Sequence, residues 1–549
     1  MNYPYWQLGF PGGVLIALVA VLHVFVSHFA VGGGFFLVAT EARARRTNDA
    51  ALLAYCKRHA TFFALLTLVF GAVSGVGIWF TIGLVSPEAT STLIHAFVWL
   101  WAIEWVFFFV EIAAAIIYAK TWETLSAGEH QIIGWIYFVA AWMSLFVING
   151  ILTFMLTPGG WLEGHSLVAG FFNPTYWPSL LTRTAAAVVL AGLFAFVTLP
   201  KDGAREQVAR LGAKWMVAGA VVMPMGLWWW SARLPLFSHI SLGMGVTSVT
   251  HALRGGVGFS VAALLIALVC GAWKPAWMRP PVVVVLVLCG IGMVGAGEYL
   301  REYLRKPWAV NTLVYANDVR ASEVAAITAN GVMKSAKFLP HADAASPEYG
   351  RDLFVLQCGA CHAVEGYRSM TRRVDGWDAA FAADILQHIH MLRGTMPPFA
   401  GDEQDRKALG KYLAGLNPEW HLTITAANKL EMGKKVFDSR CGHCHTVNGS
   451  FRPLRGTFEK ATAAQVQEVF PALSAMSSNM PDFNAPADQA EALGFYIAHE
   501  ANLPLPANTA PAQMPTGTNH SRMRRPVKPG ESATAMAKVN QNSPAQEVR

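Results

Sequence analysis

Charged side chains are scarce in this sequence. Asp, Glu, Lys and Arg make up only 14% of its 549 residues, whereas 54% of the residues are hydrophobic. A soluble globular chain does not need so much apolar surface, so a wholly soluble protein is excluded. The formal net charge is +7, but the basic residues stand in short groups at the ends of apolar runs. That local origin argues against a nucleic-acid-binding protein.

Cysteine is also scarce. Four of the seven cysteines stand in two Cys-X-X-Cys-His motifs, and the others are scattered at Cys56, Cys270 and Cys289. This distribution does not support a disulfide framework. A cleavable signal pattern is absent too, because the first apolar run is long and no basic residue precedes it. We therefore expect this run to remain as a membrane span.

Apolar residues gather in eight runs long enough to cross a bilayer, and from about residue 310 onward the composition is that of a soluble protein. The predicted spans cover residues 12–39, 60–85, 92–119, 132–156, 180–200, 215–232, 249–272 and 282–301. Basic residues follow the odd-numbered runs: Arg43, Arg45, Arg46, Lys57, Arg58, Lys120, Lys201, Arg205, Arg210, Lys214, Lys274 and Arg279. The opposite connections hold only Arg233. Because basic loops stay in the cytoplasm, the N-terminus and everything after the last span are predicted to lie outside.

The two cysteine motifs are Cys358-Gly-Ala-Cys361-His362 and Cys441-Gly-His-Cys444-His445. This pattern is typical of covalent haem c, in which two thiols bond to the haem and the adjacent histidine ligates its iron. Each motif is followed by a Met-Pro pair at nearly the same interval, which a zinc site or chance Cys-X-X-Cys pairs would not explain. The sequence therefore predicts two haem c groups. Their axial ligands are expected to be His362 with Met396 and His445 with Met480, with Met391 and Met476 as alternative methionines.

The predicted fold is all-α. A polytopic membrane bundle covers residues 1–315 and a linker covers 316–346. Two small helical cytochrome c domains follow at 347–419 and 430–502. Each is expected to begin with a helix that leads into its motif and to end with an amphipathic helix, near Lys407–Leu416 and Gln489–His499. The remainder, 503–549, is rich in Pro, Ala, Ser, Thr and Asn and is predicted to be a disordered tail.

Ionisable residues inside a span are costly and indicate function. His23 lies 11 residues into the first predicted span, roughly 16 Å deep, where it either ligates haem or bonds a neighbouring helix. Glu104 and Glu111 are seven residues apart and share a helical face, which suits a proton path or hydrogen bonds to other spans. Further polar residues gather at the outer ends of the spans: His95, Asn149, Arg183, His251, Arg254, Glu298 and Glu302. Arginines there suit haem propionates, and the asymmetry predicts electrons from outside and protons from inside.

Over about residues 10–315 the chain resembles the large subunit of the cytochrome bd oxidase superfamily. The resemblance is carried by features in a fixed order: Leu15–Thr40 with His23, Phe70–Gly77, Ala102–Glu104 with Glu111, Ile148–Gly150, Asn173-Pro174, Arg254 in Ala252–Gly255, and Glu302–Trp308. Residues 347–502 resemble tandem class I cytochrome c modules. The resemblance implies one or more non-covalent haems of b or d type in the bundle. It implies that His23 ligates such a haem and that Glu104 and Glu111 conduct protons. It also assigns haem binding to Arg254, Arg301, Arg305 and Trp308.

The chain departs from the family pattern at three places, and the missing haem b ligands and the short loop point away from quinol. Thr182 or Arg183 and Gly256 stand where the family has the ligands of its quinol-side haem b, so His251 is the candidate replacement. Gly295 stands at another ligand position, and Glu298, three residues on, is the candidate ligand or proton donor. The connection Ser231–Ser248 is short where the family's quinol oxidases carry a long hydrophilic loop.

The leading hypothesis is a bacterial inner-membrane oxidase that takes electrons from a periplasmic cytochrome c or similar carrier and reduces oxygen. Nitric oxide is the less favoured substrate. One alternative is a quinol dehydrogenase that exports electrons through its c-type haems. Another is a non-catalytic electron-transfer subunit of a larger complex. The expected partners are the electron carrier and the lipid bilayer, with a second membrane subunit as a further candidate.

Overall fold

The computed structural model describes residues 10–243, 246–335, 345–418, 420–449, 451–477, 479–483 and 485–503. The predicted tail beyond Leu503 and part of the predicted linker, 336–344, lie outside these residues.

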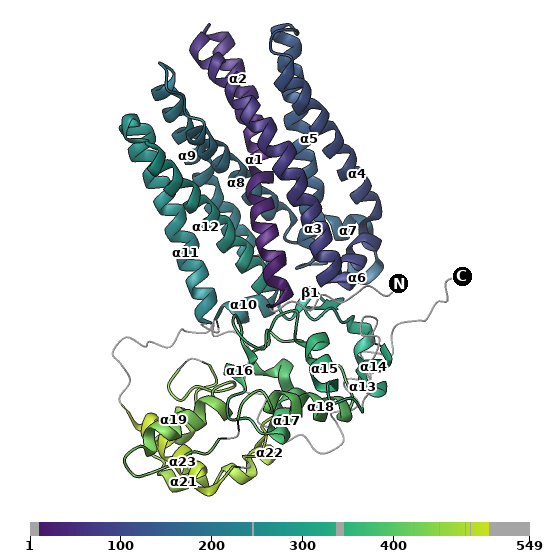
Figure 1. Ribbon diagram of the computed structural model, residues 1–549, viewed down its shortest axis with the longest axis vertical. Coiled ribbons are helices and arrows are strands. Elements are labelled where there is room, and N and C mark those ends of the chain that lie inside the picture. Colours follow the sequence, from purple (N-terminus) through teal and green to yellow (C-terminus); the bar gives the residue numbers. More distant parts are fainter. Residues whose placement is uncertain are drawn as a thin grey trace, which may run out of the picture. The chain divides into compact units, whose positions relative to one another are not determined.

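Among the described residues, eight helical segments are long and apolar enough to cross a membrane, which confirms the predicted all-α polytopic fold (Figure 1). In chain order the membrane part contains α1 (Gly12–Arg46), α2 (Ala50–Leu65), a π-helical turn (Leu66–Gly71), α3 (Ala72–Val85), α4 (Pro87–Lys120), α5 (Ala127–Phe154), α6 (Trp161–Gly164), α7 (Leu167–Phe171), α8 (Tyr176–Val197), α9 (Arg205–Ser231), α10 (Leu236–Gly243), α11 (Thr247–Ile266), a second π-helical stretch (Ala267–Trp273) and α12 (Pro280–Arg305).

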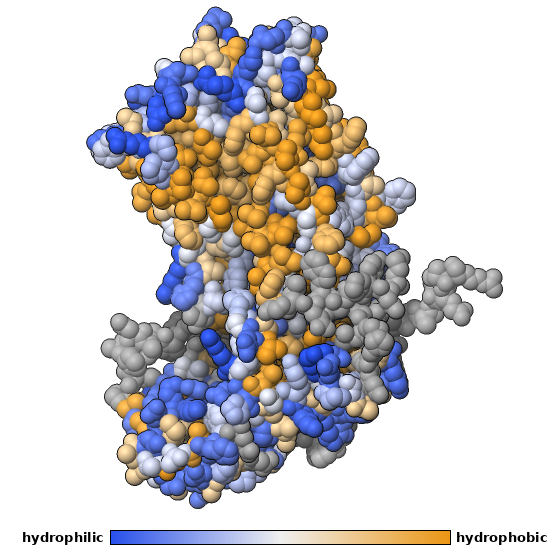
Figure 2. All heavy atoms as spheres, in the orientation of Figure 1, coloured by the Kyte–Doolittle hydropathy of each residue, from blue (hydrophilic) through white to orange (hydrophobic). Residues whose placement is uncertain are grey.

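The surface of the bundle is apolar where it would meet lipid. Figure 2 shows hydrophobic side chains gathered over the long helices and hydrophilic ones at their ends. Val73 and Trp99, inside the second and third candidate spans, are 70% and 73% exposed. A protein surrounded by water would not leave so large an apolar surface uncovered. The chain is therefore a multi-pass membrane protein.

The second span begins earlier than predicted. It was expected over 60–85, but its helix starts at Ala50 because the side chain of Asp49 accepts a hydrogen bond from the backbone N–H of Leu52 at 2.9 Å. Lys57 and Arg58 are consequently helical. They form ion pairs with Glu123 and, at 2.8 Å, with Asp202. We call this side of the bundle, where α1, α4, α8 and α11 end, the basic end.

Helices α8 and α9 approach each other closely at glycines. A Cβ atom at Gly192 would lie 2.4 Å from the carbonyl oxygen of Gly212, and one at Gly219 would lie 2.5 Å from that of Ala185. Close contact of this kind is typical of membrane helices, in which small residues let the backbones pack directly.

The part after α12 begins with a two-stranded antiparallel ribbon, β1 (Trp308–Val310) and β2 (Val314–Tyr315). Short helices α13 (Val324–Asn330) and α14 (Val332–Ser335) follow. The first module contains α15 (Tyr349–Gln357), α16 (Met370–Arg373), α17 (Ala379–Arg393) and α18 (Glu403–Ala414). The second contains α19 (Lys429–Arg440), α20 (Arg455–Phe458), α21 (Ala463–Gln467), α22 (Leu473–Met476) and α23 (Ala487–Asn502).

The two modules repeat in three dimensions as well as in sequence. In each, the helix that leads into the cysteine motif packs on the last helix through a glycine. A Cβ atom at Gly350 would lie 2.5 Å from the carbonyl oxygen of Ala408. At the equivalent Gly433 it would lie 2.1 Å from that of Ala492. Helices α18 and α23 are the predicted closing helices of the modules.

Candidate functional site

The first cysteine motif forms a tight turn at the end of α15. The backbone N–H groups of Cys361 and His362 donate to the carbonyl oxygen of Cys358 at 3.0 and 2.9 Å. The Nδ1 atom of His362 lies 3.3 Å from the carbonyl oxygen of Arg368. Because a carbonyl only accepts, Nδ1 carries the ring proton and Nε2 keeps its lone pair for a metal.

The second motif repeats this geometry. Cys444 and His445 donate to the carbonyl oxygen of Cys441 at 3.0 and 2.9 Å, and Nδ1 of His445 lies 3.1 Å from the carbonyl oxygen of Arg452. Arg368 and Arg452, which supply the two carbonyls, both adopt left-handed backbone conformations, with φ of 56° and 41°. Both histidines are thus oriented in the same way to ligate iron, and both cysteine pairs stand beside them.

The charge states at these motifs suit haem c. Burial lowers the pKa of His362 to about 4, with a smaller contribution from the nearby Arg373 cation. The imidazole is therefore neutral near pH 7, as an iron ligand must be. Burial raises the pKa of Cys358 and Cys441 to about 12, so the free thiols stay protonated until they are used. The donor set of each module fits a covalently attached haem.

The methionines differ in burial. Met396 and Met480 are half-buried, whereas the alternatives Met391 and Met476 are 38% and 58% exposed. Among the four methionines, the predicted pair is the less exposed.

The two modules contact each other at the second motif. The indole N–H of Trp377 donates to the carbonyl oxygen of Ser439 at 3.0 Å, and its ring lies 5.4 Å from that of His443, edge to face. Arg440 pairs with Asp378 at 3.0 Å. His443 stands between the two cysteines of the second motif, so this contact brings the first module against the second attachment site.

The first motif also contacts the membrane bundle. The backbone N–H of Gly13, in the first turn of α1, donates to the carbonyl oxygen of Ala360 at 3.2 Å. Ala360 stands between the two cysteines of the first motif. One hydrogen bond therefore joins this attachment site to the helix that carries His23.

His23 is held in a defined tautomer. Its Nδ1 lies 3.1 Å from the hydroxyl of Ser74, and that hydroxyl donates its own proton to the carbonyl oxygen of Phe70 at 2.7 Å. The hydroxyl can therefore only accept from His23, which places the ring proton on Nδ1. Nε2 is left with its lone pair, so the predicted ligand fits a haem iron.

A second histidine on α1 escaped the sequence reasoning. His28 is buried, and its Nδ1 lies 2.9 Å from the carbonyl oxygen of Val24. By the same argument its Nε2 is free to accept. Arg183 and Glu298 lie within electrostatic range of it. The signal was present in the sequence, since His28 is a histidine inside the first apolar run.

The predicted ionic residues at the end of α12 have protein partners. Arg301 donates to Glu298 at 2.9 and 2.7 Å, and Arg305 pairs with Glu302 and donates to the carbonyl oxygen of Ala309 at 2.7 Å. Trp308 stacks on Tyr315 with ring centroids 4.1 Å apart. These contacts hold in place Arg301, Arg305 and Trp308, which are predicted to bind haem. Glu298, the predicted ligand or proton donor, forms an ion pair with Arg301.

The other predicted membrane residues lie apart from these. His251 and Arg254 are exposed on α11, and His95 is exposed on α4. The positions that the resemblance assigns to the quinol-side ligands, Thr182 or Arg183 and Gly256, make contacts within the bundle, and the Arg183 guanidinium donates to the Ser179 hydroxyl at 3.3 Å. A Cβ atom at Gly256 would lie 3.1 Å from Cβ of Ala296, and the Thr182 hydroxyl donates to the carbonyl oxygen of Pro178 at 2.8 Å.

Glu104 and Glu111 both face α5. The hydroxyl of Ser144 donates to Glu104 at 2.7 Å, and the hydroxyl of Tyr137 lies 3.0 Å from Glu111 and 3.1 Å from the carbonyl oxygen of Ala30. Nearer the basic end, Glu41 is fully buried and bonded to Tyr118 and His130. The sequence analysis missed this cluster, because its residues lie at or beyond the ends of the predicted spans.

Comparisons with known proteins agree with this architecture. Residues 14–227 match the family model for cytochrome bd terminal oxidase subunit I, and residues 345–413 match that for cytochrome C oxidase, cbb3-type, subunit III. Among solved structures, the bd oxidase from Geobacillus thermodenitrificans is similar to the chain with a TM-score of 0.47 and 16% identity, over 54% of this chain and 87% of that one. The comparison with curated proteins found no match to this chain.

The two family models and the cysteine motifs thus indicate a bd-like membrane oxidoreductase that transfers electrons through haem. More particularly, the family models show a cytochrome bd oxidase subunit I domain in the N-terminal part and a cbb3-type cytochrome c domain after it.

Proposed function

We propose that the protein takes electrons from a periplasmic cytochrome c or a similar carrier, passes them through its two haem c groups, and delivers them to oxygen in the membrane bundle. The second module would receive the electrons and the first would pass them on toward α1, where His23 would hold a haem of the bundle. When bound, that haem supplies the site at which oxygen is reduced.

The observation that carries this proposal is the hydrogen bond between Gly13 and Ala360. It ties the first attachment motif to the start of α1. Together with the contact of Trp377 with the second motif, it provides continuous protein contact from one attachment site to the other and on to α1. A carrier that docks on the second module would then need no quinol in the membrane.

The contacts of Gly256 and Thr182 support electron input from cytochrome c in preference to quinol. Gly256 packs against Ala296, and Thr182 uses its hydroxyl within its own helix. Glycine has no ligating side chain, and the threonine hydroxyl is a poor haem ligand. The connection between α9 and α11 is short, and the helix α10 takes up about half of it, which leaves little chain for a quinol-binding loop.

The proton side is served by Glu104 and Glu111. Reduction of one oxygen molecule to water consumes four electrons and four protons, so a buried reaction site needs a proton path. Each carboxylate holds a hydroxyl partner on α5, through which a proton can be exchanged. We assign Glu111 to receive protons from the basic end and Glu104 to deliver them inward.

Two assays of purified protein in detergent test the direction of flow. The proposal predicts oxygen consumption supported by reduced horse-heart cytochrome c. Anaerobic reduction of oxidised cytochrome c by a soluble quinol, without oxygen consumption, would instead indicate an electron-exporting quinol dehydrogenase. Turnover that requires an added membrane subunit would support the alternative that this chain is an electron-transfer subunit of a larger complex.

A further inference from the structure

Helices α4 and α5 present polar residues to each other in a regular pattern. Glu104 faces Ser144 and Glu111 faces Tyr137, as described above. Seven residues further along α4, and seven back along α5, the carbonyl oxygen of Tyr118 lies 3.0 Å from Nε2 of His130. Seven residues are about two helical turns, so the three pairs share one face at intervals of roughly 10 Å.

The third pair continues into α1 through a buried carboxylate. The Tyr118 hydroxyl donates to Glu41 at 2.7 Å, and Nδ1 of His130 lies 2.9 Å from the other oxygen of that carboxylate. Arg45 donates to Glu41 at 2.6 Å, and its side chain is 26% exposed. The buried cluster therefore reaches the surface at the basic end.

The Glu41–His130 pair holds one exchangeable proton. The Tyr118 carbonyl can only accept, so Nε2 of His130 carries a proton in every state of this hydrogen bond. The remaining proton lies between Nδ1 and the Glu41 carboxylate. Beside it, the Trp122 ring lies 4.2 Å from that of His130, and its buried indole N–H has no partner in the described part of the chain. A buried donor of this kind points to a bound water.

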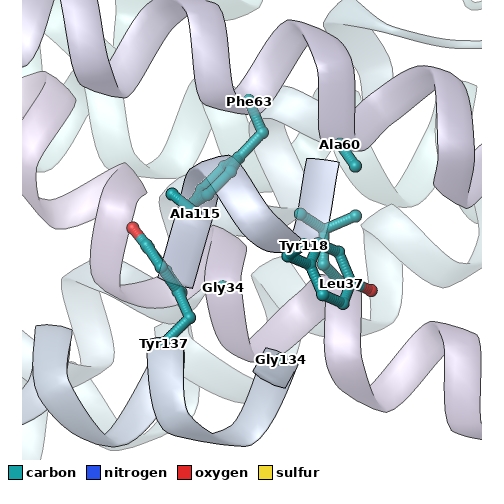
Figure 3. A pocket seen from close by; sticks show the side chains of 8 residues that line it. All are labelled: Gly34, Leu37, Ala60, Phe63, Ala115, Tyr118, Gly134 and Tyr137. Carbon is teal, nitrogen blue, oxygen red and sulfur yellow. The ribbon is translucent and has the colours of Figure 1, made fainter. Parts of the chain in front are cut away.

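A small cavity separates the third pair from the second. Its volume is about 10 Å³, which is about the space of a single water. Tyr118 and Tyr137 line it and direct their hydroxyls to opposite sides, toward Glu41 and Glu111 (Figure 3). Two glycines leave room for the rings. A Cβ atom at Gly34 would lie 2.3 Å from Tyr137, and one at Gly134 would lie 2.9 Å from Tyr118.

We propose that Glu41, His130 and Tyr118 form the proton-uptake group of this chain and feed Glu111 across the cavity. The cluster takes a proton from water at the basic end. For the transfer, Tyr118 and Tyr137 turn their hydroxyls from Glu41 and Ala30 toward a water in the cavity between them. That water passes a proton to the Tyr137 hydroxyl, which gives its own proton to Glu111. Each group ends in the protonation state in which it began, so one proton moves inward for each electron that oxygen accepts. This inference rests on the proposed function.

The test mixes fully reduced protein with oxygen and follows haem oxidation optically and proton uptake with a pH-sensitive dye. Reduction with dithionite makes the result independent of the natural electron donor. Glu41→Gln and Tyr118→Phe are expected to slow proton uptake about tenfold or more at unchanged haem content. Glu123→Gln is the matched control, because Glu123 is an exposed carboxylate at the same end, paired with Lys57. It is expected to behave as the wild type.

Wild-type proton-uptake rates in Glu41→Gln or Tyr118→Phe, with full haem content, would overturn the inference and leave the proposed function intact. If Glu41→Gln fails to assemble, Tyr118→Phe and the cavity-filling Gly134→Ala decide the matter, since both are expected to slow uptake. Wild-type protein that oxygen does not oxidise would instead overturn the proposed function, and the proton route with it.

Discussion

The Nδ1 atom of His23 donates to the hydroxyl of Ser74, which in turn donates to a backbone carbonyl. This arrangement leaves Nε2 of His23 with its lone pair, in the N-terminal half of α1. His23→Ala is therefore expected to remove one non-covalent haem and to keep both covalent haems. Acid-acetone extraction followed by pyridine haemochrome spectra measures both pools. His239→Ala, at an exposed histidine of α10, is the control, and an unchanged extractable pool in His23→Ala would show that His23 only packs.

Burial distinguishes the candidate methionine ligands of the two haem c groups. Exchange of Met396 or Met480 for Ala is expected to abolish the methionine-to-iron charge-transfer band of the corresponding module, because the half-buried thioether is the predicted ligand. Met391→Ala and Met476→Ala are the controls, since these side chains are exposed. A band that survives the first pair of substitutions and disappears in the controls would reverse the assignment.

Asp318 links the soluble part to the start of α4. Its carboxylate accepts from the backbone N–H groups of Glu88 and Ala89 at 2.9 and 3.0 Å and from the hydroxyl of Ser86 at 2.8 Å. It therefore caps the helix that carries Glu104 and Glu111. Burial nevertheless raises the pKa of Asp318 from 3.8 to about 6, against the opposing effect of these hydrogen bonds.

This pKa predicts a pH dependence of stability. Because the pKa is higher in the folded than in the unfolded state, the stabilising contribution is complete below pH 3.8 and is lost as the pH rises through about 6. The melting temperature in detergent is therefore expected to fall between about pH 5 and about pH 7 by more in the wild type than in Asp318→Asn. Intrinsic tryptophan fluorescence measures it. An identical pH dependence in the two proteins would exclude this role.

The orientation of the bundle remains a prediction from its basic residues. A reporter fused after Lys214, at the basic end, is expected to be cytoplasmic, and one fused after residue 513 is expected to be periplasmic. Alkaline phosphatase and green fluorescent protein fusions measure the two sides. The reverse pattern would contradict both the orientation and the direction of the proposed proton path.

Local patterns in the sequence were sufficient for the spans and the attachment motifs. Apolar length identifies each span, and the Cys-X-X-Cys-His spacing identifies each motif without knowledge of the fold. The seven-residue interval between Glu104 and Glu111 also placed them on one face. Their partners Ser144 and Tyr137 could not be predicted, because the register of α4 against α5 depends on tertiary packing. Glu41 was missed for a related reason: its hydrogen-bond partners come from α4 and α5, and in the sequence it stands just before a basic stretch, Arg43–Arg46.

The central claim is that electrons from cytochrome c reach oxygen through both haem c groups. The most direct measurement compares oxygen consumption by the wild type, His362→Ala and His445→Ala, with reduced cytochrome c and with a soluble quinol as donors. The account predicts turnover with cytochrome c in the wild type and its loss in both variants. Oxygen consumption with quinol that persists undiminished in both variants would contradict it.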